Sequence, residues 1–341
     1  MWILIAVASG VIQGSFTLPM KYTGRWKWEN TWGMWSVWAL LILPWAIALA
    51  TVPQLMDVYR SAGSTALTKA FVVGLCWGIG AITFGMGVHY VGIALGFAII
   101  MGLSVAVGSL VPLFMQPEKV LSPAGLLIIG GVALMMVGIA IGARAGLLKD
   151  KVLAQAAQGQ AGSEDKPILK GLIICIVAGV CGALINIALV VGAPIQEAAR
   201  TMAVRLGADP IFAPNAVWCI SLSGGFVVNF GYCCWLMTRH GTWRLFRAEQ
   251  SGINWFHTAA MGLMWMGTFA IYGICAAKMG RLGPAVGFPL FIGMAIITGN
   301  LWGLLTGEWK GSGSKPLRQM ALSVIILIVG MAGVGWSKWL A

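Results

Sequence analysis

The chain has 341 residues, of which 59% are hydrophobic and only 9% are charged. Soluble domains carry about a quarter charged residues, so this composition excludes a soluble protein and favours one that lies within a lipid bilayer. The net charge of +12 comes from Lys and Arg in short segments between apolar runs, which indicates membrane topology and a lipid partner and excludes nucleic acid.

Ten segments are long and apolar enough to span a bilayer, which requires about 20 mostly apolar residues each. They predict an all-α polytopic membrane protein with ten transmembrane helices. The first segment lacks the basic start of a signal peptide, so we expect it to remain as the first helix. The segments are 2–20, 31–52, 68–89, 91–115, 123–144, 169–192, 211–238, 256–278, 283–306 and 319–339.

The ten segments predict two inverted five-helix repeats, 1–146 and 169–341, joined by a polar linker at 147–168. Residues 92–113 align with 283–304 at a constant offset of 191, and eight of the 22 aligned residues are identical. The two aligned helices are five spans apart and therefore cross the membrane in opposite directions. Inverted repeats are typical of secondary transporters, whose substrate lies between the halves near the membrane midplane.

The distribution of basic residues predicts the orientation. Odd-numbered loops carry 14 of the 22 Lys and Arg residues. Cytoplasmic loops are enriched in these residues, so we expect the odd loops in the cytoplasm and both termini in the periplasm of a bacterial inner membrane.

The sequence does not indicate an enzyme, a cofactor or a metal site. The three histidines, His89, His240 and His257, lie at or near segment ends, and no span contains a pair of carboxylates. Membrane enzymes need several converging acids or histidines, so we expect no catalytic residues.

Amide side chains are the main polar groups inside the spans. An amide can donate and accept hydrogen bonds, which suits a neutral ligand with many hydroxyl groups. The alternative is hydrogen bonding between helices, which is common for amides in membranes. The candidates for substrate binding are Gln13, Asn186, Asn229 and Asn300.

Tryptophans form a second group of candidates. Those near the second span, including Trp32 and Trp35, fit the interfacial aromatic belt of membrane proteins or, alternatively, an apolar face for a sugar ring. Trp77 and Trp265 occupy matching places in the two repeats, so we expect them to form the two walls of the substrate site.

Lys21 and Glu29 bracket the first loop. One interpretation is a lysine that extends to the lipid interface and an acid that favours a helix start. The other is a gating ion pair at the cytoplasmic mouth of the central cavity.

The order of motifs resembles the L-rhamnose–proton symporter family, within the drug/metabolite transporter superfamily. The most specific motif is Trp26-Lys-Trp-Glu-Asn-Thr-Trp32; others are Leu18-Pro-Met-Lys21, Trp77-Gly-Ile-Gly80, Gly262-Leu-Met-Trp265 and Glu308-Trp309. The resemblance implies ten helices in two inverted repeats and proton-coupled uptake of a 6-deoxyhexose.

The chain departs from the family pattern in the ninth span. Residues 283–288 lack the acid expected there, and Phe291 stands at the position of a histidine. No acid lies at the centre of any span, so the resemblance implies proton coupling through a group near a helix end. These candidates are Glu29, His89, Glu197 and Glu308, with Glu29 first because it belongs to the most specific motif.

The sequence thus predicts a secondary active transporter, favoured as a symporter of protons with a neutral monosaccharide such as L-rhamnose. The alternative is a drug/metabolite-type carrier or a facilitator for another small neutral metabolite. The sequence makes no prediction of the oligomeric state.

Overall fold

The computed structural model describes residues 1–91, 93–156, 168–249 and 251–340. Within these ranges the chain is helical and contains no β-strand. The α-helices are α1 (Trp2–Ser15), α2 (Trp28–Ser36), α3 (Leu43–Thr51), α4 (Leu55–Ala62), α5 (Ser64–Val91), α6 (Ile93–Phe114), α7 (Pro117–Val120), α8 (Pro123–Ala156), α9 (Ile168–Val191), α10 (Ala193–Arg205), α11 (Pro214–His240), α12 (Ser251–Lys278), α13 (Gly283–Leu305) and α14 (Ser314–Trp336). The shorter helical segments are η1 (Leu18–Tyr22), η2 (Val37–Ile42), η3 (Pro210–Phe212), η4 (Thr242–Arg247) and η5 (Ser337–Trp339).

In the described part of the chain, ten helical segments are long and apolar enough to cross a membrane. They coincide with the ten predicted segments, so the predicted all-α polytopic fold is confirmed. The bounds differ mainly in the fifth span, because α8 continues to Ala156 and makes the first part of the predicted linker 147–168 helical. Residues 157–167 of that linker lie outside the described residues.

The chain forms two compact units, and each unit draws on both halves of the sequence. Unit 1 comprises Met1–Ile79 and Leu184–Pro284, and unit 2 comprises Gly80–Ala183 and Ala285–Ala341. The boundaries between the units fall within α5 and α9 and near the start of α13. The compact units therefore differ from the two predicted sequence halves, and the inverted relation of those halves stays a prediction.

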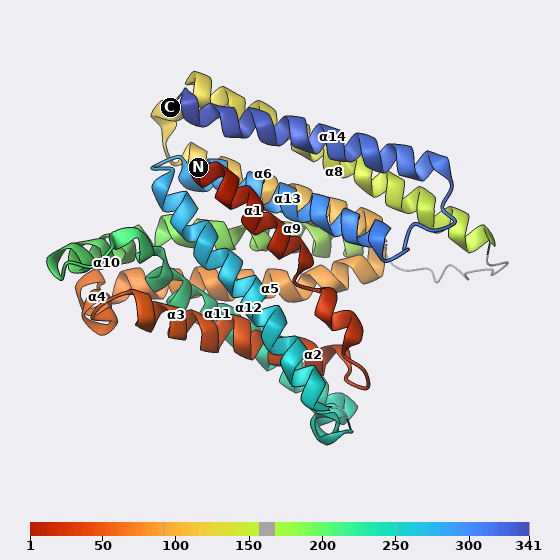
Figure 1. The fold of residues 1–341 in the computed structure, drawn as a ribbon, viewed down its shortest axis with the longest axis horizontal. Coiled ribbons are helices and arrows are strands. Elements are labelled where there is room, and N and C mark those ends of the chain that lie inside the picture. The colour runs from red at the N-terminus through yellow and green to blue at the C-terminus, as the bar shows by residue number, and fades with distance from the viewer. Residues whose placement is uncertain (92, 157–167, 250, 341) are drawn as a thin grey trace. The chain divides into compact units, whose positions relative to one another are not determined.

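Unit 1 is a bundle in which α1 lies beside α12 and α2 packs against α11 (Figure 1). The span that begins with α2 is irregular, because the π-helical segment Val37–Ile42 precedes Pro44 near the start of α3. Proline lacks an N–H and interrupts the helical hydrogen bonds, and a wider turn is one way in which a helix accommodates it. The short helices α4 and α10 pack against each other at one end of the unit.

In unit 2, α8 and α14 lie side by side along most of their length (Figure 1). A Cβ atom added to Gly131 would lie 2.7 Å from the carbonyl oxygen of Gly330, so the two backbones almost touch there. Two turns away, the hydroxyl of Ser323 donates a hydrogen bond of 2.7 Å to the carbonyl oxygen of Gly138. Small residues allow this close approach, which stabilises helix pairs in lipid.

A similar close approach joins α5 to α11 in unit 1. A Cβ atom on Gly74 would lie 1.7 Å from the carbonyl oxygen of Ser221, and one on Gly224 would lie 2.2 Å from that of Phe71. Both distances are far below van der Waals contact. The crossing therefore requires glycine on each helix, and it fixes α5 against α11 in the part of α5 that precedes Trp77.

This crossing predicts that Gly224→Ala destabilises the protein. Overpacking of this kind costs about 1 to 3 kcal/mol, so we expect a lower thermal unfolding midpoint in detergent and a lower yield in membranes. The matched control is Gly231→Ala on the same helix, where an added Cβ would meet no atom within 4 Å. Equal midpoints for the two variants would contradict the assigned packing.

Candidate functional site

Most of the predicted functional residues lie in unit 1. The substrate-binding candidates there are Gln13, Trp32, Trp35, Trp77, Asn186, Asn229 and Trp265, whereas Asn300 lies in unit 2. Among the gating and coupling candidates, Lys21, Glu29 and Glu197 lie in unit 1 and Glu308 lies in unit 2. The side chain of His89 lies outside the part of the chain that the structure describes.

Four of the predicted tryptophans form a continuous row, which we call the tryptophan row: Trp32, Trp35, Trp265 and Trp77. Successive ring centroids along it are 4.2, 5.5 and 5.6 Å apart. Aromatic rings at such separations are in direct contact and stabilise each other. Three helices of unit 1 supply the row, since α2 carries its first two members, α12 carries Trp265 and α5 carries Trp77.

The row corrects one expectation about its two repeat-related members. The sequence suggested that Trp77 and Trp265 form opposite walls with the substrate between them. Their rings instead lie 5.6 Å apart at an interplanar angle of 34°, so they pack against each other and leave no space for a sugar ring between them.

Polar groups accompany the row. The indole Nε1 of Trp32 donates a hydrogen bond of 3.1 Å to Asn229 Oδ1, and Asn229 Nδ2 donates in turn to the carbonyl oxygen of Gly225 at 2.9 Å. Trp35 is only 1% exposed, and its indole N–H has no hydrogen-bond partner among the described residues. A buried donor without a partner costs free energy.

The other predicted amides make specific bonds to the protein. Thr268, on the turn of α12 that follows Trp265, donates to Gln13 Oε1 at 2.8 Å. The buried hydroxyl of Tyr272 donates to Asn186 Oδ1. Asn186 Nδ2 then donates to the carbonyl oxygen of Pro284 at 3.0 Å, so this amide joins α9 to α12 and to the start of α13.

Asn300 differs from these residues, because its Nδ2 donates to the carbonyl oxygen of Ile296 at 3.0 Å within the same helix. Bonding between helices, the alternative interpretation of the amides, therefore describes Gln13, Asn186 and Asn229. Sequence reasoning missed the partners Thr268 and Tyr272, because no spacing rule relates residues on helices so distant in sequence.

Among the described residues, Glu29 is the acid whose side chain is buried, with 7% of it exposed. Its Oε1 lies 3.1 Å from His240 Nδ1 and accepts a hydrogen bond of 3.1 Å from the hydroxyl of Thr242. Hydrogen bonds to an ionised group are stronger than neutral ones. This cluster, which we call the Glu29 cluster, joins the start of α2 to the end of α11 and to η4.

Local structure explains why Glu29 lies there. It belongs to the first turn of α2, where a negative charge is favoured by the helix dipole. The backbone N–H of Lys27 donates to Asn30 Oδ1 at 3.3 Å as part of a capping box, and Asn30 Nδ2 donates to the carbonyl oxygen of Thr242 at 3.0 Å. The side chain of His240 is 50% exposed, so the cluster reaches from the buried carboxylate to the surface of the protein.

Trp26, the first residue of the tryptophan-rich motif, also joins separate segments of unit 1. Trp26 is buried, and its Nε1 donates to the carbonyl oxygen of Leu245 at 3.1 Å and to the hydroxyl of Ser251 at 3.2 Å. Its ring packs edge-on against Phe246 and Trp255 at 5.0 and 5.5 Å. Trp26 therefore fixes the first loop to η4 and α12.

The other charged candidates have different surroundings. Glu197 is exposed on α10 and lies 3.8 Å from Arg200, and Glu308 is exposed and accepts a long hydrogen bond of 3.5 Å from Thr306. Lys21 is exposed in η1. Glu29 contacts the side chains of His240 and Thr242, and its expected pairing with Lys21 stays a prediction.

Comparison with known proteins gives one consistent result. A family model described as L-rhamnose-proton symport protein matches residues 1–338. A protein named L-rhamnose-proton symporter from Mannheimia succiniciproducens is 30% identical over 335 residues, covering 95% of this chain and 94% of its own length. Proteins with the same name from Cronobacter sakazakii and Escherichia coli are 30% and 29% identical and cover 98% and 99% of this chain, and 96% and 97% of their own lengths.

The geometry of the Glu29 cluster predicts that Glu29 and His240 stabilise the protein as a pair. In a double-mutant cycle with Glu29→Gln and His240→Gln, each single change leaves a partner unsatisfied, so the double variant should lose less stability than the two single losses together. We expect a coupling of about 0.5 to 3 kcal/mol in thermal unfolding.

A parallel cycle with Glu29→Gln and Lys21→Met tests the pairing expected from the sequence and serves as the comparison. Additivity within about 0.5 kcal/mol in the cycle with His240 would contradict the cluster. A coupling confined to the cycle with Lys21 would assign Glu29 to the pairing expected from the sequence.

Proposed function

This chain belongs to the L-rhamnose-proton symport protein family, and on that premise we propose that it imports L-rhamnose, or a similar neutral monosaccharide, together with protons across the inner membrane. The match over residues 1–338 is the observation on which this proposal rests. Ten spanning helices and a family of transporters agree with a carrier and not with an enzyme.

The tryptophan row is the proposed sugar site. L-rhamnose is a 6-deoxyhexose, so it presents a methyl group and apolar C–H faces as well as hydroxyl groups. Sites for such ligands combine aromatic walls with a few polar groups. In unit 1, the row supplies the wall, and the indole N–H of Trp35, which has no partner among the described residues, supplies a donor. Asn229 supplies an amide beside Trp32 at one end of the row, and Gln13 supplies one next to Thr268, a turn beyond Trp265.

The Glu29 cluster is the proposed proton site. A proton from water would reach the half-exposed His240 and pass from its Nδ1 across 3.1 Å to Glu29 Oε1. Neutralising the carboxylate weakens its charge-assisted bonds to His240 and Thr242. The start of α2 is then held less firmly against α11 and η4.

Proton binding is coupled to sugar binding because both proposed sites include residues of α2. Glu29 lies one turn before Trp32, and Trp32 and Trp35 begin the tryptophan row. When the first turn of α2 is bound less firmly to α11 and η4, the position of Trp32 and Trp35 in the sugar site therefore changes. A proton and a sugar that both favour the same position of α2 would bind cooperatively.

For orientation we propose that both termini face the periplasm and that the odd-numbered loops face the cytoplasm. The excess of Lys and Arg in the odd loops supports this arrangement. Alkaline phosphatase fused at Ala161 should be inactive, and an active fusion there would contradict the orientation.

The sugar site predicts that Trp265→Leu weakens transport of L-rhamnose. Loss of one aromatic contact should raise the KM for exchange in proteoliposomes by about tenfold. The matched control is Trp235→Leu, which removes the same side chain from an exposed position on α11. An unchanged KM for the Trp265 variant would remove the row from the sugar site.

The proton site predicts that Glu29→Gln separates exchange from accumulation. The variant should exchange labelled L-rhamnose at equal concentrations across the membrane, but it should lose the accumulation that an imposed pH gradient drives in the wild type. Glu118→Gln, at an exposed acid of α7, should retain both activities. Undiminished gradient-driven accumulation by the Glu29 variant would contradict the assignment.

A further inference from the structure

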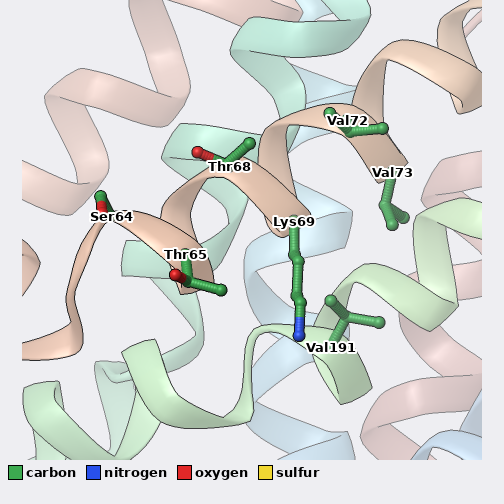
Figure 2. Close-up of a pocket in the computed structure, with 7 residues that line it drawn as sticks. All are labelled: Ser64, Thr65, Thr68, Lys69, Val72, Val73 and Val191. Atoms are coloured by element: carbon green, nitrogen blue, oxygen red, sulfur yellow. The ribbon is translucent and has the colours of Figure 1, made fainter.

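An open surface pocket of about 560 Å³, which we call the cavity, lies in unit 1 and contains none of the residues assigned to the sugar or the proton (Figure 2). Its walls come from the first turns of α5 and from the last residue of α9. The lining residues are Ser64, Thr65, Thr68, Lys69, Val72, Val73 and Val191. Figure 2 shows that the side chain of Lys69 extends across this cavity toward the end of α9.

The lining residues of α5 form one stripe with a polar end and an apolar end. Their positions recur at intervals of three and four residues, so they share one face of the helix. Ser64, Thr65, Thr68 and Lys69 occupy its first two turns, and Val72 and Val73 follow on the third. At 1.5 Å per residue the stripe runs for about 14 Å along the helix, with its polar part at the end of the span.

Lys69 is the cation of this stripe. It lies within the spanning segment Ser64–Val88 and is exposed. The described residues supply no acid that pairs with it. The acids on the neighbouring short helices are already engaged, Asp57 with Arg60 at 2.8 Å and Glu197 with Arg200 at 3.8 Å. A lysine near a membrane surface attracts anionic lipid, and each such residue contributes to the affinity.

We propose that this cavity binds the headgroup of an anionic phospholipid, such as phosphatidylglycerol. The phosphate accepts hydrogen bonds from the Lys69 ammonium and from the hydroxyls of Thr65 and Thr68. The start of an acyl chain lies over Val72 and Val191. The two ends of the stripe thus match the two parts of one lipid molecule.

The composition of the cavity favours an anionic lipid over other ligands. It has no aromatic wall of the kind that receives a sugar. A free phosphate would use the polar end but not the valines. A zwitterionic lipid brings its own ammonium, which Lys69 repels and which no carboxylate in the cavity attracts. The bound lipid would join the start of α5 to the end of α9, and nothing in this proposal depends on the transported solute.

The test is thermal unfolding and lipid retention of the purified full chain in mixed micelles. Phosphatidylglycerol should raise the unfolding midpoint more than phosphatidylcholine at the same mole fraction, and native mass spectrometry should detect its retention. Lys69→Gln should weaken phosphatidylglycerol binding about fivefold. Lys69→Arg should keep the binding, because it keeps the charge and shows that the position tolerates substitution.

The matched control is Lys338→Gln, at a lysine near the end of the last span that does not line the cavity. It should leave phosphatidylglycerol binding unchanged. Equal binding by Lys69→Gln and the wild type, or equal effects of the two lipids, would overturn the proposal. An equal effect of inorganic phosphate alone would assign the cavity to a free anion and would also overturn it.

Discussion

The hydrocarbon core of a membrane offers no hydrogen-bond partner, and this constraint governs the whole chain. Backbone groups therefore bond within helices, and polar side chains in the spans are stabilised where they find partners within the protein. Thr268 binds Gln13, Tyr272 binds Asn186, and Trp32 binds Asn229. Each bond joins two helices, so the few polar groups of the spans also determine which helices neighbour each other in unit 1.

The same constraint explains why Glu29 has both a histidine and a hydroxyl as partners. Burying a carboxylate is costly unless it is paired and hydrogen-bonded, and Glu29 receives both His240 and Thr242. Capping of α2 by Asn30, and the fixing of the first loop by Trp26, hold the carboxylate in place. The most family-specific motif of the sequence thus forms a local structure around one buried acid. The tryptophan row begins one turn further along the same helix.

The sequence predicted the ten spans because length and hydropathy determine them almost alone. It also selected Trp77 and Trp265, which do come together. It failed to predict that these rings touch, because a repeat relates positions along the chain and gives no distance between side chains. It missed His240 as the partner of Glu29 for a related reason, since the two residues are 211 positions apart and only the folded bundle brings them together. The sequence did not indicate that the first part of the predicted linker is helical, because a polar sequence can continue a helix beyond the membrane, as α8 does to Ala156.

The central claim is that the sugar and the proton cross the membrane together. The most direct measurement adds L-rhamnose to a lightly buffered suspension of proteoliposomes that contain the wild-type protein, and follows the external pH together with uptake of labelled sugar. The account predicts a transient rise in external pH that accompanies sugar entry and disappears with a protonophore. Entry of L-rhamnose without any change in external pH would contradict it.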